Sequence, residues 1–111
     1  ADGSYARVLY VIVDADGIYL GDQRIDVHQA VPVILALLEK EGVKNIMFCA
    51  TDLARYGDMI QIYAALKKSP YVLNSFPTFS EPIATRRPLF GRFQLHYGHL
   101  WLDEENGVEF Y

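Results

Sequence analysis

The sequence predicts an α+β fold in which two helices pack on one face of a mixed β-sheet. Three observations lead to this prediction: an early strand rich in valine and isoleucine, two stretches with apolar residues at helical spacing, and strand-like segments near the C-terminal end. We expect a ββαβαβ core over residues 7–76 and a β-meander over residues 77–111. The 111 residues, 51% hydrophobic and 22% charged, are typical of a single domain.

The first predicted strand covers residues 7–14, RVLYVIVD, and is apolar at nearly every position. This composition indicates burial on both faces, as in a central strand. Ala15-Asp16-Gly17 then predicts a tight turn, because Asp-Gly is a strong hairpin signal. A short return strand follows over residues 18–20, and residues 23–25 are expected to pair briefly.

The first predicted helix starts after Asp26, which is typical of an N-cap and is followed three residues later by Gln29. Gly42 is a natural C-terminal stop. Pro32 interrupts the pattern, because proline cannot donate a backbone hydrogen bond, and it predicts either a kink or a later helix start. The expected apolar stripe consists of Ala30, Val33, Ile34, Leu37 and Leu38.

The middle of the chain predicts a strand, a helix and a second strand. Residues 46–48 form a short apolar run, residues 56–67 show helical spacing, and residues 71–73 begin the next strand. Such a unit usually gives parallel strands joined by a right-handed crossover. We expect Leu37 and Ile60 to lie on the buried faces of the two helices.

Aromatic residues dominate the C-terminal segment. Strands are predicted over residues 92–97, 99–103 and 108–111, with Asn106-Gly107 as the turn before the last one. We interpret the aromatic side chains as a small satellite core packed on the sheet. The alternative is a partner-binding surface, where aromatic residues are enriched. The candidates for such a surface are Trp101, Phe110 and Tyr111.

Two stretches resemble the periplasmic domain of the ExbD/TolR biopolymer-transport family. VLYVIVDADGIYLGDQRID is similar to the opening of that domain, and IMFCATDLARYGDMIQIYAALKKS is similar to its second half. The resemblance covers roughly residues 7–76. Ser69-Pro70 stands where the family usually has Ala-Gly, and the segment from Pro77 onward has no counterpart in the family pattern.

The resemblance implies a non-enzymatic interaction domain of a single-pass inner-membrane protein that faces the periplasm. Such proteins work with an ExbB/TolQ-like channel protein and couple the proton motive force to TonB- or TolA-like proteins. The family also implies a homodimer and, in the TolR branch, contact with peptidoglycan. By the same resemblance, Arg55 and Tyr56, in the loop before the second helix, are candidate partner-binding residues on the family's partner-facing side. No stretch matches the family's transmembrane helix with its embedded Asp, so no proton-pathway residue is assigned.

Asp14-Ala15-Asp16-Gly17 permits a different interpretation. It matches the first motif of haloacid-dehalogenase-like phosphotransferases, in which the first Asp, here Asp14, is the nucleophile, the second, here Asp16, is the acid/base, and Mg²⁺ binds between them. Thr51 would serve as the second motif. That fold needs a distal Lys and a second acidic pair, and such short motifs often occur by chance. We therefore favour a hairpin turn. A stand-alone module that binds peptidoglycan or another ligand is the third possibility.

Other functions find little support in the sequence. The net charge of −4 and the absence of a basic stripe argue against nucleic acid binding, and Arg86-Arg87 is interpreted as a solvated loop. Cys49, the single cysteine, is interpreted as a buried inert thiol. His96 and His99 are interpreted as surface residues and not as metal ligands. We expect no catalytic residue, no cofactor and no metal site, and no stretch reaches the roughly 20 apolar residues of a membrane span.

Overall fold

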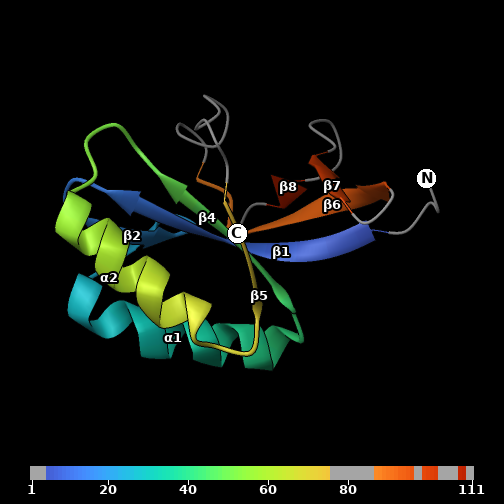
Figure 1. Ribbon diagram of the computed structural model, residues 1–111, viewed down its shortest axis with the longest axis horizontal. Coiled ribbons are helices and arrows are strands. Elements are labelled where there is room, and N and C mark those ends of the chain that lie inside the picture. Colours follow the sequence, from blue (N-terminus) through green and yellow to red (C-terminus); the bar gives the residue numbers. More distant parts are fainter. Residues whose placement is uncertain (1–4, 76–86, 97–98, 103–107, 110–111) are drawn as a thin grey trace.

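The structure is a computed structural model that describes residues 5–75, 87–96, 99–102 and 108–109. It contains two helices and eight strands in one sheet (Figure 1). In chain order these are β1 (Tyr5–Asp14), β2 (Gly17–Leu20), β3 (Gln23–Ile25), α1 (Val27–Glu41), β4 (Asn45–Ala50), α2 (Tyr56–Lys67), β5 (Val72–Ser75), β6 (Phe90–His96), β7 (His99–Leu102) and β8 (Val108–Glu109).

Strand β1 is the centre of the sheet. Along one edge it pairs in parallel with β4, from Val8 to Val13. Its other edge is shared by two antiparallel strands: β2 pairs with the C-terminal end, Ile12–Asp14, and β6 pairs with the N-terminal half, Tyr5–Leu9. Farther out, β3 pairs with β2, and β5 pairs in parallel with β4. The sheet is therefore mixed, as predicted. It forks at β1, in the sense that β2 and β6 pair with different halves of the same edge of this strand.

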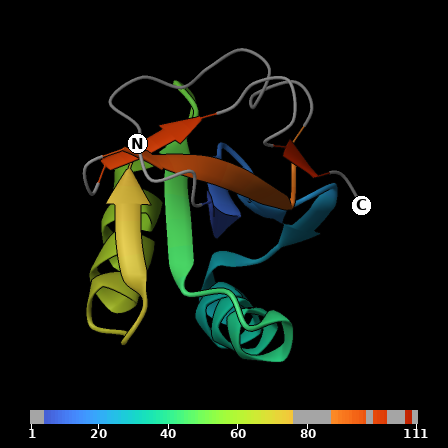
Figure 2. The same ribbon diagram turned by 90° about the vertical axis from the view of Figure 1, so that its right-hand side faces the viewer.

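Both helices cover the same face of the sheet (Figures 1 and 2). Alternate residues of β1 and β4 point toward them, because side chains alternate between the faces of a strand. This confirms the predicted fold class, two helices on one face of a mixed sheet. The core between sheet and helices includes Leu9, Val11 and Val13 of β1, Ile46 and Phe48 of β4, Ile34 and Leu38 of α1, and Ile62 and Leu66 of α2.

The opposite face of the sheet is buried as well, which confirms the prediction that β1 is buried on both faces. Cys49 is buried, as the sequence indicates, and burial raises the pKa of its thiol to about 12. Burial also raises the pKa of Tyr10, whose hydroxyl has no hydrogen-bond partner among the described residues. The cluster on this face consists of Val8, Tyr10, Ile12, Met47, Cys49 and Phe93.

Helix α1 begins and ends where the sequence predicts. Asp26 caps it, with one carboxylate oxygen accepting a 2.9 Å hydrogen bond from the backbone of His28. Gly42 closes it in the left-handed conformation, at φ 66°. Pro32 lies inside the helix, so the predicted later start is wrong. The hydrogen bond that Pro32 cannot donate would reach the carbonyl of His28, four residues earlier, and that residue is exposed.

The predicted buried face of α2 is wrong in one respect. Ile60 is 49% exposed, whereas Ile62 and Leu66 are fully buried. Apolar side chains occur on two sides of this helix, so their spacing alone did not identify the side that meets the sheet. On α1, Leu37 is partly buried and packs against the core, close to the prediction.

The C-terminal extension belongs to the same sheet. Strand β6 starts at Phe90, two residues earlier than predicted, and β7 pairs with it as expected. Strand β8 pairs with β6 and not with β7, so the predicted meander is wrong at its last step. Phe90 lies in the helix-side core and Phe93 in the opposite cluster, so β6 contributes to both. The predicted turn at Asn106-Gly107 lies outside the described residues.

Candidate functional site

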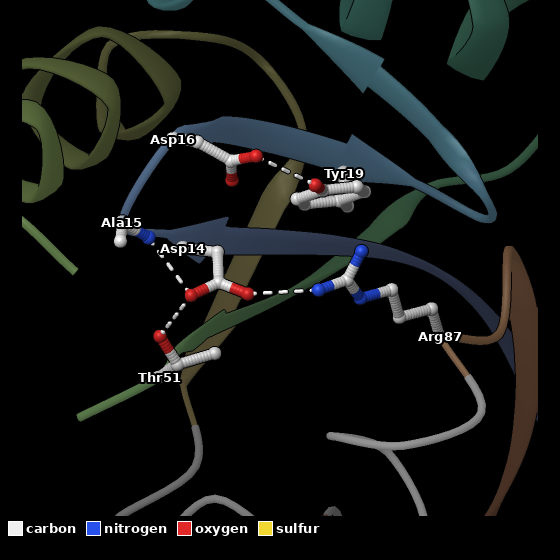
Figure 3. Close-up of polar contacts among 6 residues, drawn as sticks. All are labelled: Asp14, Ala15, Asp16, Tyr19, Thr51 and Arg87. Carbon is white, nitrogen blue, oxygen red and sulfur yellow. Dashed lines mark hydrogen bonds and ion pairs between the residues drawn. The ribbon is translucent and has the colours of Figure 1, made fainter. Parts of the chain in front are cut away.

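Three polar groups converge on Asp14, where β1 ends (Figure 3). One carboxylate oxygen accepts hydrogen bonds from the Thr51 hydroxyl, at 2.7 Å, and from the backbone N–H of Ala15, at 2.8 Å. The other oxygen accepts a 2.9 Å hydrogen bond from the guanidinium of Arg87 and pairs with its charge. Thr51 directly follows β4. Because β1 and β4 are parallel neighbours, their C-terminal ends lie next to each other, which places Thr51 beside Asp14.

These contacts stabilise the charged form of Asp14. The Thr51 hydroxyl makes the largest contribution to lowering the pKa of the carboxyl below its usual value, and Ala15 and Arg87 add to it against the opposing effect of burial. The Arg87 guanidinium also stacks on the Tyr19 ring, 3.5 Å from its centroid. Arg87 itself has φ 48°, in the left-handed region that residues other than glycine rarely adopt.

Asp16 does not join Asp14. Its carboxylate accepts a 3.0 Å hydrogen bond from the Tyr19 hydroxyl, and its backbone carbonyl accepts one from Arg24. Figure 3 shows the two carboxylates turned toward different partners. The structure thus brings Thr51 to Asp14, as the phosphotransferase motif would require, but leaves Asp16 tied to the hairpin. Among the described residues, no three His, Cys, Asp or Glu side chains are grouped to hold a metal ion.

An open polar hollow lies between the β1–β2 turn and the first turns of both helices. Arg55 lies at the N-terminal end of α2 and lines this hollow without capping the helix. Asp58, one turn into α2, faces α1 across it. The lining residues are Ala15, Asp16, Gly17, Asp26, Val27, His28, Arg55 and Asp58.

The other side of α2 carries exposed apolar residues. Tyr56 is 76% exposed and Ile60 49%, and Leu53 in the preceding turn is 73% exposed. Tyr56 and Ile60 each lie two positions from Asp58, about 200° around an α-helix, so they point away from α1. We call Tyr56 and Ile60 the outer flank of α2.

Strand β5 forms an open edge on the same side of the molecule as the outer flank. Helix α1 contacts β2 and helix α2 contacts β5, so the side of α2 that faces away from α1 lies toward β5. Among the described residues, β5 pairs only with β4. The four residues of β5 carry no charge, and Val72 is 55% exposed. An unpaired strand edge of this kind can accept another strand.

The edge at β3 is less suited to pairing. It is only three residues long, it presents the exposed side chains of Gln23 and Arg24, and it leads directly into the Asp26 cap of α1. Short edge strands with charged side chains are the usual protection against unwanted strand pairing. Of these two edges, β5 is therefore the better candidate for an interaction site.

The predicted partner-binding residues separate into two groups. Arg55 and Tyr56 both lie at the start of α2, with Arg55 in the hollow and Tyr56 on the outer flank. Trp101 lies in β7, with its backbone opposite Gln94, whereas residues 110–111, Phe110 and Tyr111, lie outside the described residues.

Sequence analysis missed Val72 and Arg87. Val72 gave no signal beyond its place in a short strand. Arg87 was interpreted as part of a solvated loop, which is wrong, because it is partly buried against Asp14 and Tyr19. No local pattern marks this contact, since Asp14 and Arg87 are 73 positions apart.

Comparison with family models, curated proteins and solved structures found no match to this chain. No helix among the residues that the structure describes combines the length and the apolar character needed to cross a membrane.

Proposed function

We propose that this chain is a non-enzymatic interaction domain of the ExbD/TolR type, which binds an extended segment of a partner protein along the β5 edge. In this proposal it is the periplasmic part of a single-pass inner-membrane protein. Its partners are an ExbB/TolQ-like channel protein and a TonB- or TolA-like protein that receives the energy of the proton motive force. The observation that carries the proposal is the uncharged edge of β5, which has no second strand partner among the described residues and lies beside exposed apolar residues of α2.

Strand addition at β5 has a direct physical basis. An added strand gains main-chain hydrogen bonds to the outward N–H and C=O groups of β5, and its alternate side chains determine specificity. The register places Leu73 with Ile46 on the helix-facing side and Val72 with Asn45 on the other. Ile46 belongs to the helix-side core, so residues of the bound segment on that side would lie next to α2.

The surroundings of Asp14 favour this proposal over a phosphotransferase. A nucleophilic carboxylate needs an accessible oxygen beside a metal ion. Here both oxygens of Asp14 accept hydrogen bonds, and Arg87 already supplies the positive charge. Asp16 is held by the Tyr19 hydroxyl and does not face the same space. The arrangement suits a residue that closes the end of β1 and fastens the extension.

The coding sequence upstream of Ala1 tests the family assignment. We expect it to encode a segment of roughly 20 apolar residues with one embedded Asp, the length that a transmembrane helix requires. A coding sequence that lacks such a segment would refute the assignment to this family.

Photo-crosslinking tests the β5 edge. We would place p-benzoylphenylalanine at Val72 and, as a matched control on the other edge, at Gln23, and express both variants in cells of the source organism. We expect Val72 to give an adduct with a membrane-anchored protein and Gln23 to give none. An equal yield from both positions, or none from Val72, would contradict strand addition at β5.

A further inference from the structure

We infer that the partner segment that binds along β5 carries acidic side chains at one end, and that these contact exposed lysines where β5 begins. The inference rests on the proposed strand addition at β5 and deepens it, because it states the chemistry of the segment and which of its ends lies where. Three features support it: the main-chain groups that β5 leaves open, the side of α2 that borders them, and the charges at the start of the strand.

The open main-chain groups of β5 belong to alternate residues. The backbone N–H of Val72 donates a 2.9 Å hydrogen bond to the carbonyl of Lys44, so the main-chain groups of Val72 point toward β4. Because the N–H and C=O groups of successive strand residues point to opposite edges, those of Leu73 and Ser75 point outward. No strand pairs with this outward edge among the described residues. A partner segment would therefore gain its main-chain hydrogen bonds at Leu73 and Ser75.

One side of α2 borders this open edge. Four residues of the helix are spaced by four, three and four positions and therefore share that side: Tyr56, Ile60, Tyr63 and Lys67. The Nζ atom of Lys67 lies 5.9 Å from the centroid of the Tyr63 ring, one turn earlier. Figure 2 shows β5 in yellow at the margin of the sheet, with α2 on the same side. Helix-facing residues of a bound segment would contact this side of α2, whose last residue is Lys67.

The start of β5 is basic. Lys44 lies beside it through the main-chain hydrogen bond described above, and Lys67 and Lys68 precede it across a short turn. All three lysines are exposed, and none forms an ion pair with the described residues. Glu41, the acidic residue nearest to Lys44 in the sequence, instead lies 4.0 Å from Arg7. An uncharged strand with lysines at one end favours a segment whose carboxylates lie at that same end.

Acidic side chains suit this end of β5 better than the C-terminus of a partner chain. A terminus brings one carboxylate, whereas the lysines at the end of α2 and before β4 can receive several. Each exposed ion pair contributes little to affinity, and charges at the rim of an interface mainly determine specificity. The lysines would therefore decide which segment binds and in which register, more than how tightly it binds.

Fluorescence anisotropy with synthetic peptides tests the inference. The probe is a labelled peptide of alternating valine and threonine with a pair of glutamates at one end, made with the pair before or after the alternating residues. The matched peptides carry lysines in place of the glutamates. We expect at least one glutamate peptide to bind roughly fivefold more tightly than its lysine counterpart at low salt. Equal binding, or no binding of any peptide, would overturn the inference.

Variants of the chain locate the effect. Replacing both Lys44 and Lys67 with Gln should remove the preference for glutamate. Arg55→Gln is the control, because Arg55 is exposed at the opposite end of α2 and lines the hollow. Ser75→Pro should weaken the binding of every peptide, since proline removes one outward N–H and edge strands tolerate it. Circular dichroism should show that all three variants remain folded.

The outcomes separate the inference from the proposed function. A preference for glutamate that survives the double replacement of Lys44 and Lys67 would overturn the inference. Equal binding of glutamate and lysine peptides that Ser75→Pro weakens would overturn it too, but would leave strand addition at β5 intact. Binding that Ser75→Pro does not change, together with no Val72 adduct in cells, would refute both.

Discussion

Replacing Asp14 with Asn tests whether the contact with Arg87 fastens the C-terminal extension to the sheet. The substitution keeps the size and shape of the side chain and removes its negative charge. The amide oxygen can still accept hydrogen bonds from Thr51 and Ala15, whereas Arg87 loses its counter-ion. We therefore expect the variant to fold but to have a lower free energy of unfolding.

The expected loss at pH 7 is about 2–4 kcal/mol. A hydrogen bond to a charged group contributes about 1.5–3 kcal/mol and one between neutral groups about 0.5–1.5 kcal/mol. The bonds from Thr51 and Ala15 each weaken by about the difference between these ranges. The Arg87 contact adds less than its full value, because its side chain is 30% exposed and solvent screens it. The Asp14 side chain is 17% exposed, so screening there is smaller.

The loss should depend on pH in a defined direction. The pKa of Asp14 is lowered from 3.8 in the folded protein, so its stabilising contribution is complete above the pKa of the unfolded chain. That contribution disappears as the pH falls through the lower folded pKa. The difference between wild type and Asp14→Asn should therefore be constant from pH 7 to about pH 5 and should close below about pH 4.

Urea unfolding followed by circular dichroism measures this difference at pH 7, 5 and 3. Asp22→Asn is the control, because Asp22 is exposed in the turn between β2 and β3 and no contact of its side chain is found among the described residues. We expect that variant to match the wild type at every pH. Equal stability of wild type and Asp14→Asn at pH 7 would refute the reasoning. So would a difference that stays constant into strong acid.

Four further predictions follow from the burial pattern and the site. Ile62→Ala should cost about 2–5 kcal/mol in urea unfolding, because Ile62 is fully buried, whereas Ile60→Ala should cost less than about 1 kcal/mol; equal costs would show that the buried face of α2 is misassigned. Cys49 should stay unreactive toward a thiol reagent at pH 8 until urea is added, because burial raises its pKa to about 12; fast labelling of the folded protein would contradict this. Deleting residues 92–111, Arg92 to Tyr111, should change the oligomeric state or cause aggregation, because it removes Phe93 from the cluster on the opposite face of the sheet. Light scattering that shows an unchanged, folded monomer would contradict this prediction. A phosphatase assay with Mg²⁺ should show no turnover, and turnover lost in Asp14→Asn would instead favour the enzyme alternative.

Local chemistry explains the parts of the fold that could be predicted. Asp26 and Gly42 mark the ends of α1 because an N-cap carboxylate and a left-handed glycine act within a few residues. The β1–β2 hairpin lies where the sequence predicts a turn, but its two loop residues are Ala15 and Asp16, and Gly17 is already the first residue of β2. The parallel pairing of β4 and β5 follows from the strand–helix–strand order.

Contacts between distant residues explain the parts that could not be predicted. Arg87 and Asp14 are 73 positions apart in the sequence, and no local sequence pattern predicts that their side chains meet. The choice of β8 to pair with β6 depends on which strand edge is free once β7 is in place. Ile60 was assigned to the core because it shares the helical spacing of Met59 and Tyr63, but the sheet packs against the side of α2 that carries Ile62 and Leu66.

The fork of the sheet at β1 means that the two strands that share one edge of β1 pair with it at different times during folding. Strand β2 follows β1 within a few residues and can pair with it early, but β6 follows both helices and strands β4 and β5 in the chain before it pairs with the N-terminal half of β1. Loop closure over such a distance is slow, and folding rates fall as contacts become less local. Until then, half of one edge of the central strand is open to other chains. Shielding of this strand edge until β6 pairs would therefore affect the yield of folded protein more than its final stability.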